Sequence, residues 1–176
     1  MRGQGVELCN FLEGKQRFVI PVYQRNYDWK EEQCKQLFTD IVSVIQNDRQ
    51  SHFFGSIVFK QSGTAFERDY IIIDGQQRIT TVSILLTAIY TLLSKSELRS
   101  ENENLGQEIY ETFLVNKFQK KEDLKVKLKS IKKDEQAYKA ILAGEDFVNV
   151  SNITSNYKLF CDLLKQSPVS VEQMQK

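Results

Sequence analysis

The chain has 176 residues, 41% hydrophobic and 27% charged, which is enough for one globular domain with its own hydrophobic core. Its 24 Lys and Arg residues nearly balance its 23 Asp and Glu residues, so the net charge of +1 argues against nucleic-acid binding through bulk charge alone. Because His52 is the only histidine, a zinc site, a Ser-His-Asp triad or a histidine-metal nuclease centre is nearly excluded within this chain.

The three cysteines, Cys9, Cys34 and Cys161, are widely spaced and do not have the spacing of metal ligands. An odd number of separated cysteines predicts reduced, mostly buried thiols in a cytoplasmic protein. No apolar core follows the first residues, so no signal peptide is expected. The most apolar stretch, residues 79–93, contains several Ser and Thr residues and is shorter than the about 20 residues of a membrane span, so no membrane contact is expected.

The first predicted element is a short strand at residues 18–20, which Pro21 ends because proline has no amide proton for a sheet. A loop of polar and aromatic residues follows. Asp28, with Glu31 three residues later, has the pattern of an N-cap and predicts a helix over residues 29–47. Apolar side chains recur on one face of this helix, as expected for a helix that packs on a core.

A hairpin and a buried helix are predicted next. Residues 53–59 are rich in β-formers, and residues 69–73 return as a continuously apolar strand that we expect to be buried on both faces. Gly55, inside the first strand, indicates a bulge or the close approach of another backbone or a ligand. Residues 79–93 then predict a buried helix.

The C-terminal part differs in character. After a charged linker at residues 94–104, apolar residues and lysines alternate over residues 124–128 and predict a short strand. Helices are predicted at residues 109–118, 134–142 and 153–164, with another starting at Ser170. We therefore expect an α+β fold in which residues 1–95 form a small mixed sheet flanked by helices and residues 96–176 form a mostly helical extension. A helix that starts so near the last residue indicates a fragment of something longer.

The turn Asp74-Gly75-Gln76-Gln77-Arg78 joins the apolar strand to the buried helix. The first amides of a helix lack intrahelical partners and lie at the positive end of the macrodipole, so such a turn suits an anion. Arg78 adds a cation that stays charged. The sequence therefore predicts a phosphate site, most simply for a nucleotide. In the structural alternative, Asp74 and Gln77 form a capping box and Gly75 only supplies a backbone conformation.

A second polar cluster, Gln24-Arg25-Asn26, follows the first predicted strand in the same way. Because both strands are expected in one sheet, we predict that the two clusters are neighbours and that Gln24 bridges them. Arg25 is a candidate phosphate contact or, alternatively, a structural ion-pair partner of Asp74. Tyr23 is a candidate to stack on a base.

Three motifs together resemble those of one known family. Residues 20–29, Ile-Pro-Val-Tyr-Gln-Arg-Asn-Tyr-Asp-Trp, resemble its IPxYQRxYxW motif, and residues 54–58, Phe-Gly-Ser-Ile-Val, resemble its (F/L)GSIV strand. Residues 73–81, Ile-Asp-Gly-Gln-Gln-Arg-Ile-Thr-Thr, resemble its signature IDGQQRLTT. In this order they are similar to the N-terminal domain of GmrSD-type modification-dependent restriction enzymes, and weaker similarities follow at residues 124–128 and 155–157.

The resemblance implies a core similar to the ParB/sulfiredoxin fold. It also implies binding and hydrolysis of a nucleoside triphosphate, GTP or ATP, coupled to cleavage of modified foreign DNA in phage defence. The DNA-cutting centre would then lie in a C-terminal HNH-type domain beyond Lys176 or in a partner subunit. The loop that carries a cysteine in sulfiredoxins has none here, and a P-loop is absent.

Phosphoryl transfer needs neutralised charge and a positioned water, which assigns roles to the turn. Gln76 or Gln77 is predicted to orient the water, and Asp74 to contact Mg²⁺ or a ribose hydroxyl. The predicted catalytic residues are Asp74, Gln76, Gln77 and Arg78. The predicted nucleotide-binding residues are Tyr23, Gln24, Arg25, Gly75, Arg78, Thr80 and Thr81. Tyr27 and Trp29 could also stack on a base, although packing against the following helix is the favoured interpretation for Trp29.

Lys125, Lys127 and Lys129 alternate along the predicted strand and are candidate contacts to DNA phosphates, although charged runs usually only solvate a surface. Two other functions therefore stay open beside the nucleotide hydrolase. One is a ParB-like module that grips DNA with the same pocket, and the other is a regulatory domain that senses a nucleotide without catalysis. The sequence does not settle the base preference, the recognised DNA modification or the oligomeric state.

Overall fold

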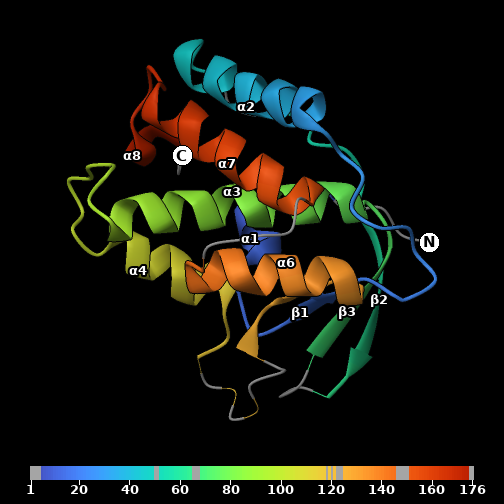
Figure 1. Ribbon diagram of the computed structural model, residues 1–176. Coiled ribbons are helices and arrows are strands. Elements are labelled where there is room, and N and C mark those ends of the chain that lie inside the picture. Colours follow the sequence, from blue (N-terminus) through green and yellow to red (C-terminus); the bar gives the residue numbers. More distant parts are fainter. Residues whose placement is uncertain are drawn as a thin grey trace.

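The computed structural model describes residues 5–49, 52–64, 68–117, 119, 121, 125–145 and 151–174 (Figure 1). The strands are β1 (Arg17–Val19), β2 (Val58–Gly63), β3 (Arg68–Asp74) and β4 (Leu128–Lys129). The longer helices are α2 (Glu31–Gln46), α3 (Gln76–Ser94), α6 (Lys132–Ala143) and α7 (Asn152–Lys165). The shorter helices are α1 (Leu8–Leu12), α4 (Leu105–Ile109), the π-helix η1 (Tyr110–Leu114) and α8 (Val171–Met174).

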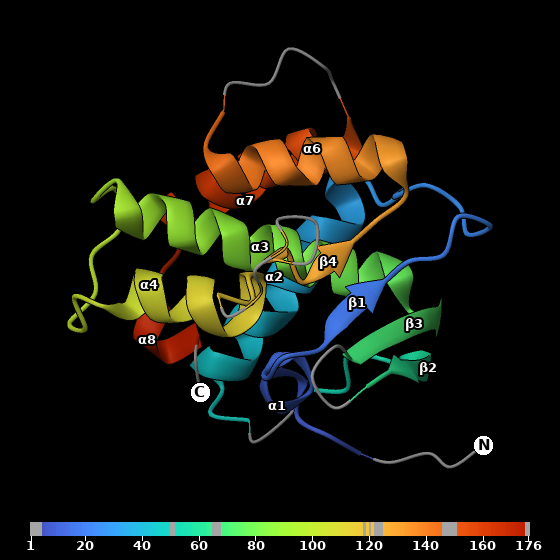
Figure 2. The ribbon, with the colours of Figure 1, turned by 90° about the horizontal axis from the view of Figure 1, so that it is seen from below.

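The four strands form one mixed sheet in the order β2-β3-β1-β4 (Figure 2). β1 runs parallel to both β3 and β4, whereas β2 and β3 form the predicted antiparallel hairpin. Helices pack around this sheet, so the predicted α+β fold with a small mixed sheet is confirmed. β4 comes from the C-terminal half, so both halves of the chain contribute strands to one sheet and side chains to one hydrophobic core. The division of the chain into two parts at residue 95 stays a prediction.

The predicted buried helix is α3, which runs through the middle of the molecule (Figure 1). Most of its side chains are buried, including every residue from Ile79 to Leu85, and α7 packs along it. Its hydroxyl side chains do not stay unpaired. Thr81, Thr87 and Thr91 each donate to the backbone carbonyl four residues earlier. A helix with polar residues at intervals can therefore lie in the core without unsatisfied hydroxyls.

The helix predicted at residues 29–47 is α2, and its start differs from the prediction. The N-cap is Lys30 rather than Asp28, and the Gln33 side chain accepts a hydrogen bond from the Lys30 amide at 2.9 Å. Asp28 does not act as the cap because its backbone is held by a long-range contact to Gln77, described below. Local capping patterns were overridden here by a tertiary hydrogen bond.

The strand predicted at residues 53–59 starts only at Val58. Gly55 has a φ of +103°, and the Ser56 carbonyl accepts a hydrogen bond from Arg78 Nη1 at 2.8 Å. A Cβ at Gly55 would lie 2.7 Å from Arg78 Nε, so the close approach at this glycine is made by a side chain and not, as predicted, by another backbone or a ligand. The segment before Val58 is thus shaped by an arginine side chain.

Strand β3 is not buried on both faces as predicted. Ile72 is fully buried, whereas Ile73 is 50% exposed. Successive side chains of a strand point to opposite faces, so the two isoleucines face different environments. The apolar run reflects high β-propensity more than two-sided burial.

The strand predicted at residues 124–128 is also displaced. The regular strand, β4, covers only residues 128–129, and Leu124 lies outside the described residues. Val126 forms an isolated antiparallel bridge with Val115, at the end of the π-helix η1. The chain therefore pairs twice, first with η1 and then with β1, and does not continue as one flat strand.

Lys127 points into the core and not outwards with its neighbours. It is 2% exposed, and its Nζ donates to the carbonyls of Leu12, in α1, and Thr112, in η1. Lys129 is exposed and Lys125 is partly buried. The predicted row of three lysines facing DNA is therefore corrected, because the Lys127 ammonium is occupied by backbone carbonyls inside the fold.

Because the Lys127 ammonium is buried, we expect the free energy of unfolding of the chain to depend on pH. Burial lowers the pKa of its ammonium to about 8, against an ordinary value of 10.5. As the pH rises from 8 to 10.5, the folded state loses this proton first, so the unfolded state binds more protons and folding is favoured. The free energy of unfolding of the natural chain should rise relative to that of a Lys127→Met variant, by up to about 3 kcal/mol. Urea unfolding at several pH values measures this difference, and a difference that stays flat would contradict the prediction.

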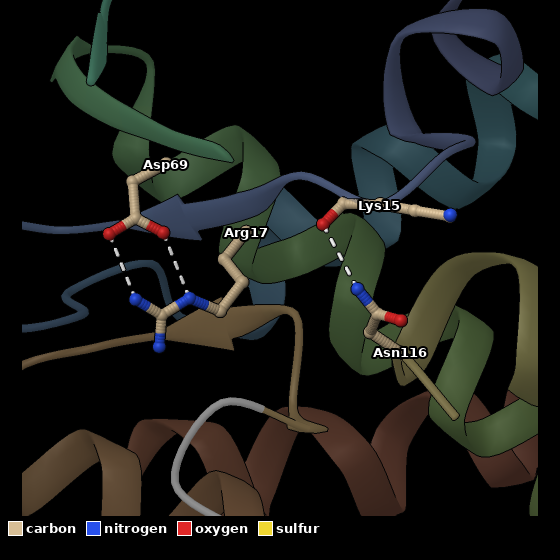
Figure 3. A network of polar contacts seen from close by, with 4 residues as sticks. All are labelled: Lys15, Arg17, Asp69 and Asn116. Atoms are coloured by element: carbon tan, nitrogen blue, oxygen red, sulfur yellow. Dashed lines mark hydrogen bonds and ion pairs between the residues drawn. The ribbon is translucent and has the colours of Figure 1, made fainter. Parts of the chain in front are cut away.

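Two further polar contacts fix the start of β1 (Figure 3). Arg17 and Asp69 face each other across the register of β1 and β3, and they form a two-pronged ion pair with N–O distances of 2.9 and 2.8 Å. Buried Asn116 donates from Nδ2 to the Lys15 carbonyl at 3.1 Å. These contacts orient the strand whose other end leads into the candidate site.

The remaining composition-based expectations concern thiols, the histidine and membranes. All three cysteines are free; Cys34 is buried and Cys161 partly so, whereas Cys9 is exposed, contrary to the prediction of mostly buried thiols. His52 lies on the surface as expected, with Nε2 3.7 Å from Asp40 Oδ2. Within the described ranges, no helix has the length and apolar character needed to cross a bilayer.

Candidate functional site

The two polar clusters begin where neighbouring strands end. β1 leads into Gln24-Arg25-Asn26, β3 leads into the turn that starts at Asp74, and the two strands are parallel. The carboxyl ends of parallel strands lie at the same edge of a sheet, which is where α/β folds commonly bind ligands. The predicted proximity is confirmed, because Gln24 Nε2 donates to the Ile73 carbonyl at 2.9 Å and bridges the two loops.

Gly75 is the residue that lets α3 begin directly at the end of β3. Its φ of +90° is in the left-handed region, and a Cβ would lie 3.1 Å from both the Ser56 carbonyl oxygen and Ile57 Cγ1. In the described part of the chain no side chain caps this helix start, so the capping box of Asp74 and Gln77 is not formed. The first amides of α3 are therefore available to a ligand.

The Gln77 side chain holds the loop that follows β1. Its Oε1 accepts hydrogen bonds from the amides of Asp28, at 2.8 Å, and Trp29, at 3.1 Å. Its Nε2 donates to the Asn26 carbonyl at 3.1 Å. Both acceptor positions of the side-chain oxygen are used, so the predicted water-orienting role of Gln77 is corrected to a structural one. Its backbone amide stays part of the predicted anion site.

Tyr27 belongs to this loop, but its side chain is buried and is therefore not available to stack on a base. Its hydroxyl lies 2.8 Å from Thr81 Oγ1 and accepts a hydrogen bond from Asn156 Nδ2 at 3.0 Å. Burial raises the pKa of this phenol, so it stays a neutral donor and acceptor. Thr80 and Thr81 are 1% and 0% exposed, and their predicted contacts to a nucleotide are therefore corrected: both belong to the packing under the site.

The C-terminal half supplies residues to the site for which the sequence analysis predicted no role there. Asp134, in α6, accepts from the Tyr27 amide through Oδ2 at 2.7 Å, and burial raises the pKa of this carboxyl. From α7, Asn152 donates to the Tyr27 carbonyl at 3.3 Å and Asn156 donates to the Trp29 carbonyl at 2.8 Å. The available signal was Asn156 itself, a polar side chain in the buried part of an amphipathic helix.

Arg78 and Arg25 differ in how firmly they are held. Arg78 is partly buried, passes close to Gly55 and donates to the Ser56 carbonyl, which leaves further guanidinium donors for a ligand. Arg25 is exposed and makes no hydrogen bond or ion pair with a described residue. The alternative of a structural ion pair between Arg25 and Asp74 is therefore not formed.

An open pocket of about 200 Å³ lies at the start of α3. It is lined by both loops and by the turn, through Gln24, Arg25, Trp29, Asp74, Gly75, Gln76, Gln77 and Arg78. Trp29 thus contributes to the pocket wall as well as packing on the core. Tyr23 is 76% exposed and does not line the pocket.

Among the residues that the structure describes, Asp74 is the single carboxylate that lines this pocket. Over the described ranges there is no group of three His, Cys, Asp or Glu side chains that could hold a metal by themselves. Mg²⁺ commonly binds through one or two carboxylates together with the phosphates of a substrate. Asp74 therefore fits a Mg²⁺ ion that arrives with a phosphate ligand, and not a resident metal centre.

The fold and the site define a class of protein: a small α+β domain with an arginine-lined pocket at the carboxyl ends of two parallel strands. A family model described as the GmrSD restriction endonuclease, N-terminal domain, matches residues 8–175, so the chain belongs to this family. The resemblance carried by the three motifs is confirmed, and the chain is a domain of a restriction system. A comparison with curated proteins gave no match.

Proposed function

We propose that this domain binds and hydrolyses a nucleoside triphosphate, GTP or ATP, and that it serves a DNA-cutting part outside this chain or in a partner subunit. The main support is the open pocket of about 200 Å³ at the uncapped start of α3, flanked by Arg25 and Arg78. Oriented helix amides and arginine side chains are the groups that recognise phosphate. The free thiols agree with a cytoplasmic location, which we also propose.

The described contacts assign a role to each residue of the pocket. The amides of Gln76 and Gln77 would hold phosphate oxygens, and Arg25 and Arg78 would neutralise their charge. The water-orienting role stays with Gln76, because the Gln77 side chain is occupied by backbone groups. Asp74 would contact Mg²⁺ carried by the triphosphate, since an unshielded carboxylate repels a bare phosphate.

Calorimetric titration of the purified chain with GTP, ATP, CTP and UTP, with and without Mg²⁺, tests binding. Arg25→Ala is the most informative variant, because this exposed side chain lines the pocket and makes no hydrogen bond or ion pair with a described residue. It should weaken binding by roughly tenfold or more, the value of a charge-assisted hydrogen bond. Arg99→Ala, at an exposed position outside the pocket, is the matched control and should leave affinity unchanged.

Two other functions are supported by particular observations. Val22 and Tyr23 are 89% and 76% exposed beside Arg25, which suits a loop that contacts a DNA backbone. Salt-dependent DNA binding without saturable nucleotide binding would favour this function. The single carboxylate of the pocket suits a nucleotide sensor without turnover. Phosphate release, measured on the samples used for titration, separates the sensor from the hydrolase.

A further inference from the structure

A narrow crevice lies beside the open pocket and shares three lining residues with it: Arg25, Gln76 and Gln77. Its other polar lining residues are Tyr27, Thr80, Ser130, which lies between β4 and α6, and Asp134, which lies in the first turn of α6. The crevice therefore connects the turn at the start of α3 to the C-terminal half of the domain.

The crevice contains buried acceptors that lack partners. Gln76 and Ser130 are 7% and 6% exposed, and neither Gln76 Oε1 nor Ser130 Oγ has a hydrogen-bond partner among the described residues. Asp134 uses Oδ2 for the Tyr27 amide, whereas its Oδ1 accepts no bond from a described residue and is not one of the fully buried atoms. Buried polar atoms of this kind are rare and costly, so this cluster calls for a donor.

Arg25 is the donor that the crevice can reach. In this structure the crevice has no room for a water molecule, so a donor reaches these atoms only when neighbouring side chains move. Among the described residues, Arg25 is the only cationic residue that lines the crevice, and its exposed side chain makes no hydrogen bond or ion pair with them. A guanidinium carries five donors in a flat fork, which suits a carboxylate flanked by an amide oxygen and a hydroxyl.

We propose that Gln76 Oε1, Ser130 Oγ and the Asp134 carboxylate form an anchoring site for the Arg25 guanidinium, and that Asp134 thereby positions Arg25 for an anion in the open pocket. A change of side-chain rotamer turns one edge of the guanidinium to the crevice, while the other edge faces the pocket. An anchored arginine loses less conformational freedom when a ligand binds, which strengthens binding. The anchoring needs no ligand, and only the second half of the inference rests on the proposed function.

The ligand-free chain tests the anchoring by double-mutant cycles on stability. Asp134→Asn is suited to this test, because its amide oxygen can still accept from the Tyr27 amide while an NH₂ group replaces the second oxygen. Asp134→Asn and Ser130→Ala should each lower the urea midpoint when Arg25 is present. In an Arg25→Ala background both effects should shrink, and Ser130→Ala should become neutral or stabilising because it removes an unpartnered hydroxyl. Strictly additive effects overturn the anchoring.

Titrations with GTP and ATP test the positioning role. Asp134→Asn should weaken affinity by roughly fivefold when Arg25 is present and should have no effect in the Arg25→Ala background. A merely structural role of Asp134 would weaken both backgrounds equally, and that result overturns the positioning. If no triphosphate binds but the stability cycle shows coupling, the anchoring stands and the proposed function fails. If triphosphates bind and the stability cycle is additive, the proposed function stands and the anchoring fails.

Discussion

Replacing Gln77 by alanine is expected to lower the free energy of unfolding by about 3 kcal/mol. The side chain makes three hydrogen bonds to the backbone of the loop after β1, at Asn26, Asp28 and Trp29. The substitution leaves two amides and one carbonyl without their partner, and each lost bond of this kind costs about 1 kcal/mol. Because the same loop carries Arg25, we also expect nucleotide affinity to fall.

Gln36→Ala is the matched control for this prediction. The Gln36 side chain donates only to Asp40, four residues along the exposed face of α2, at 2.8 Å. Such a pair contributes about 0.2–0.5 kcal/mol, so the control should unfold almost like the natural chain. Gln77→Glu sharpens the comparison, since it keeps the acceptor for Asp28 and Trp29 but places an oxygen against the Asn26 carbonyl. Equal urea midpoints for Gln77→Ala and Gln36→Ala would show that the Gln77 side chain does not stabilise the loop after β1.

Replacing Gly75 by alanine is the second large expected effect, a loss of about 2–5 kcal/mol in the free energy of unfolding. The residue has a φ of +90°, which costs a side-chain-bearing residue roughly 1–2 kcal/mol. In addition, the new Cβ would lie 3.1 Å from the Ser56 carbonyl oxygen and from Ile57 Cγ1, and overpacking adds about 1–3 kcal/mol. Relief of this close contact would move the segment before β2 and distort the pocket.

A Gly144→Ala variant separates the cost of the left-handed backbone conformation from the cost of the close contact. Gly144 ends α6 with a φ of +72°, and a Cβ there meets nothing within 4 Å. It therefore carries only the backbone penalty, about 1–2 kcal/mol. Thermal or urea unfolding of both variants should show that Gly75→Ala is clearly the more destabilised. Similar losses at the two glycines would mean that the close contact at Gly75 is relieved by the loop and does not constrain the site.

Patterns in the sequence predicted the elements of the fold better than their ends. Hydrophobic periodicity located α3 and α7, and turn residues located the β2–β3 hairpin, because these signals are local. The starts of α2 and β2 were misplaced because long-range contacts decide them: Gln77 holds the loop before α2, and Arg78 holds the segment before β2. No local signal reports contacts between residues that lie 49 or 22 positions apart in the sequence.

The site was predicted in outline and corrected in its details. Two strand-ending polar clusters in one sheet were enough to predict that Gln24 bridges the loops and that Arg25 lies at the pocket. Polarity alone could not show that Gln77 and Thr81 point into the fold, because their partners are backbone groups and a buried tyrosine. The contribution of Asp134 was missed, since it depends on α6 packing against the loop after β1.

The central claim is that triphosphate oxygens bind the first amides of α3. The most direct measurement is a ¹H–¹⁵N NMR titration of the labelled chain with Mg-GTP and Mg-ATP. Saturable shift changes are expected at the amides of Gln76 and Gln77. The amides of Gly106 and Gln107, at the start of α4, also lack a side-chain cap and should not respond. Unchanged shifts at Gln76 and Gln77, or equal responses at both helix starts, would contradict the claim.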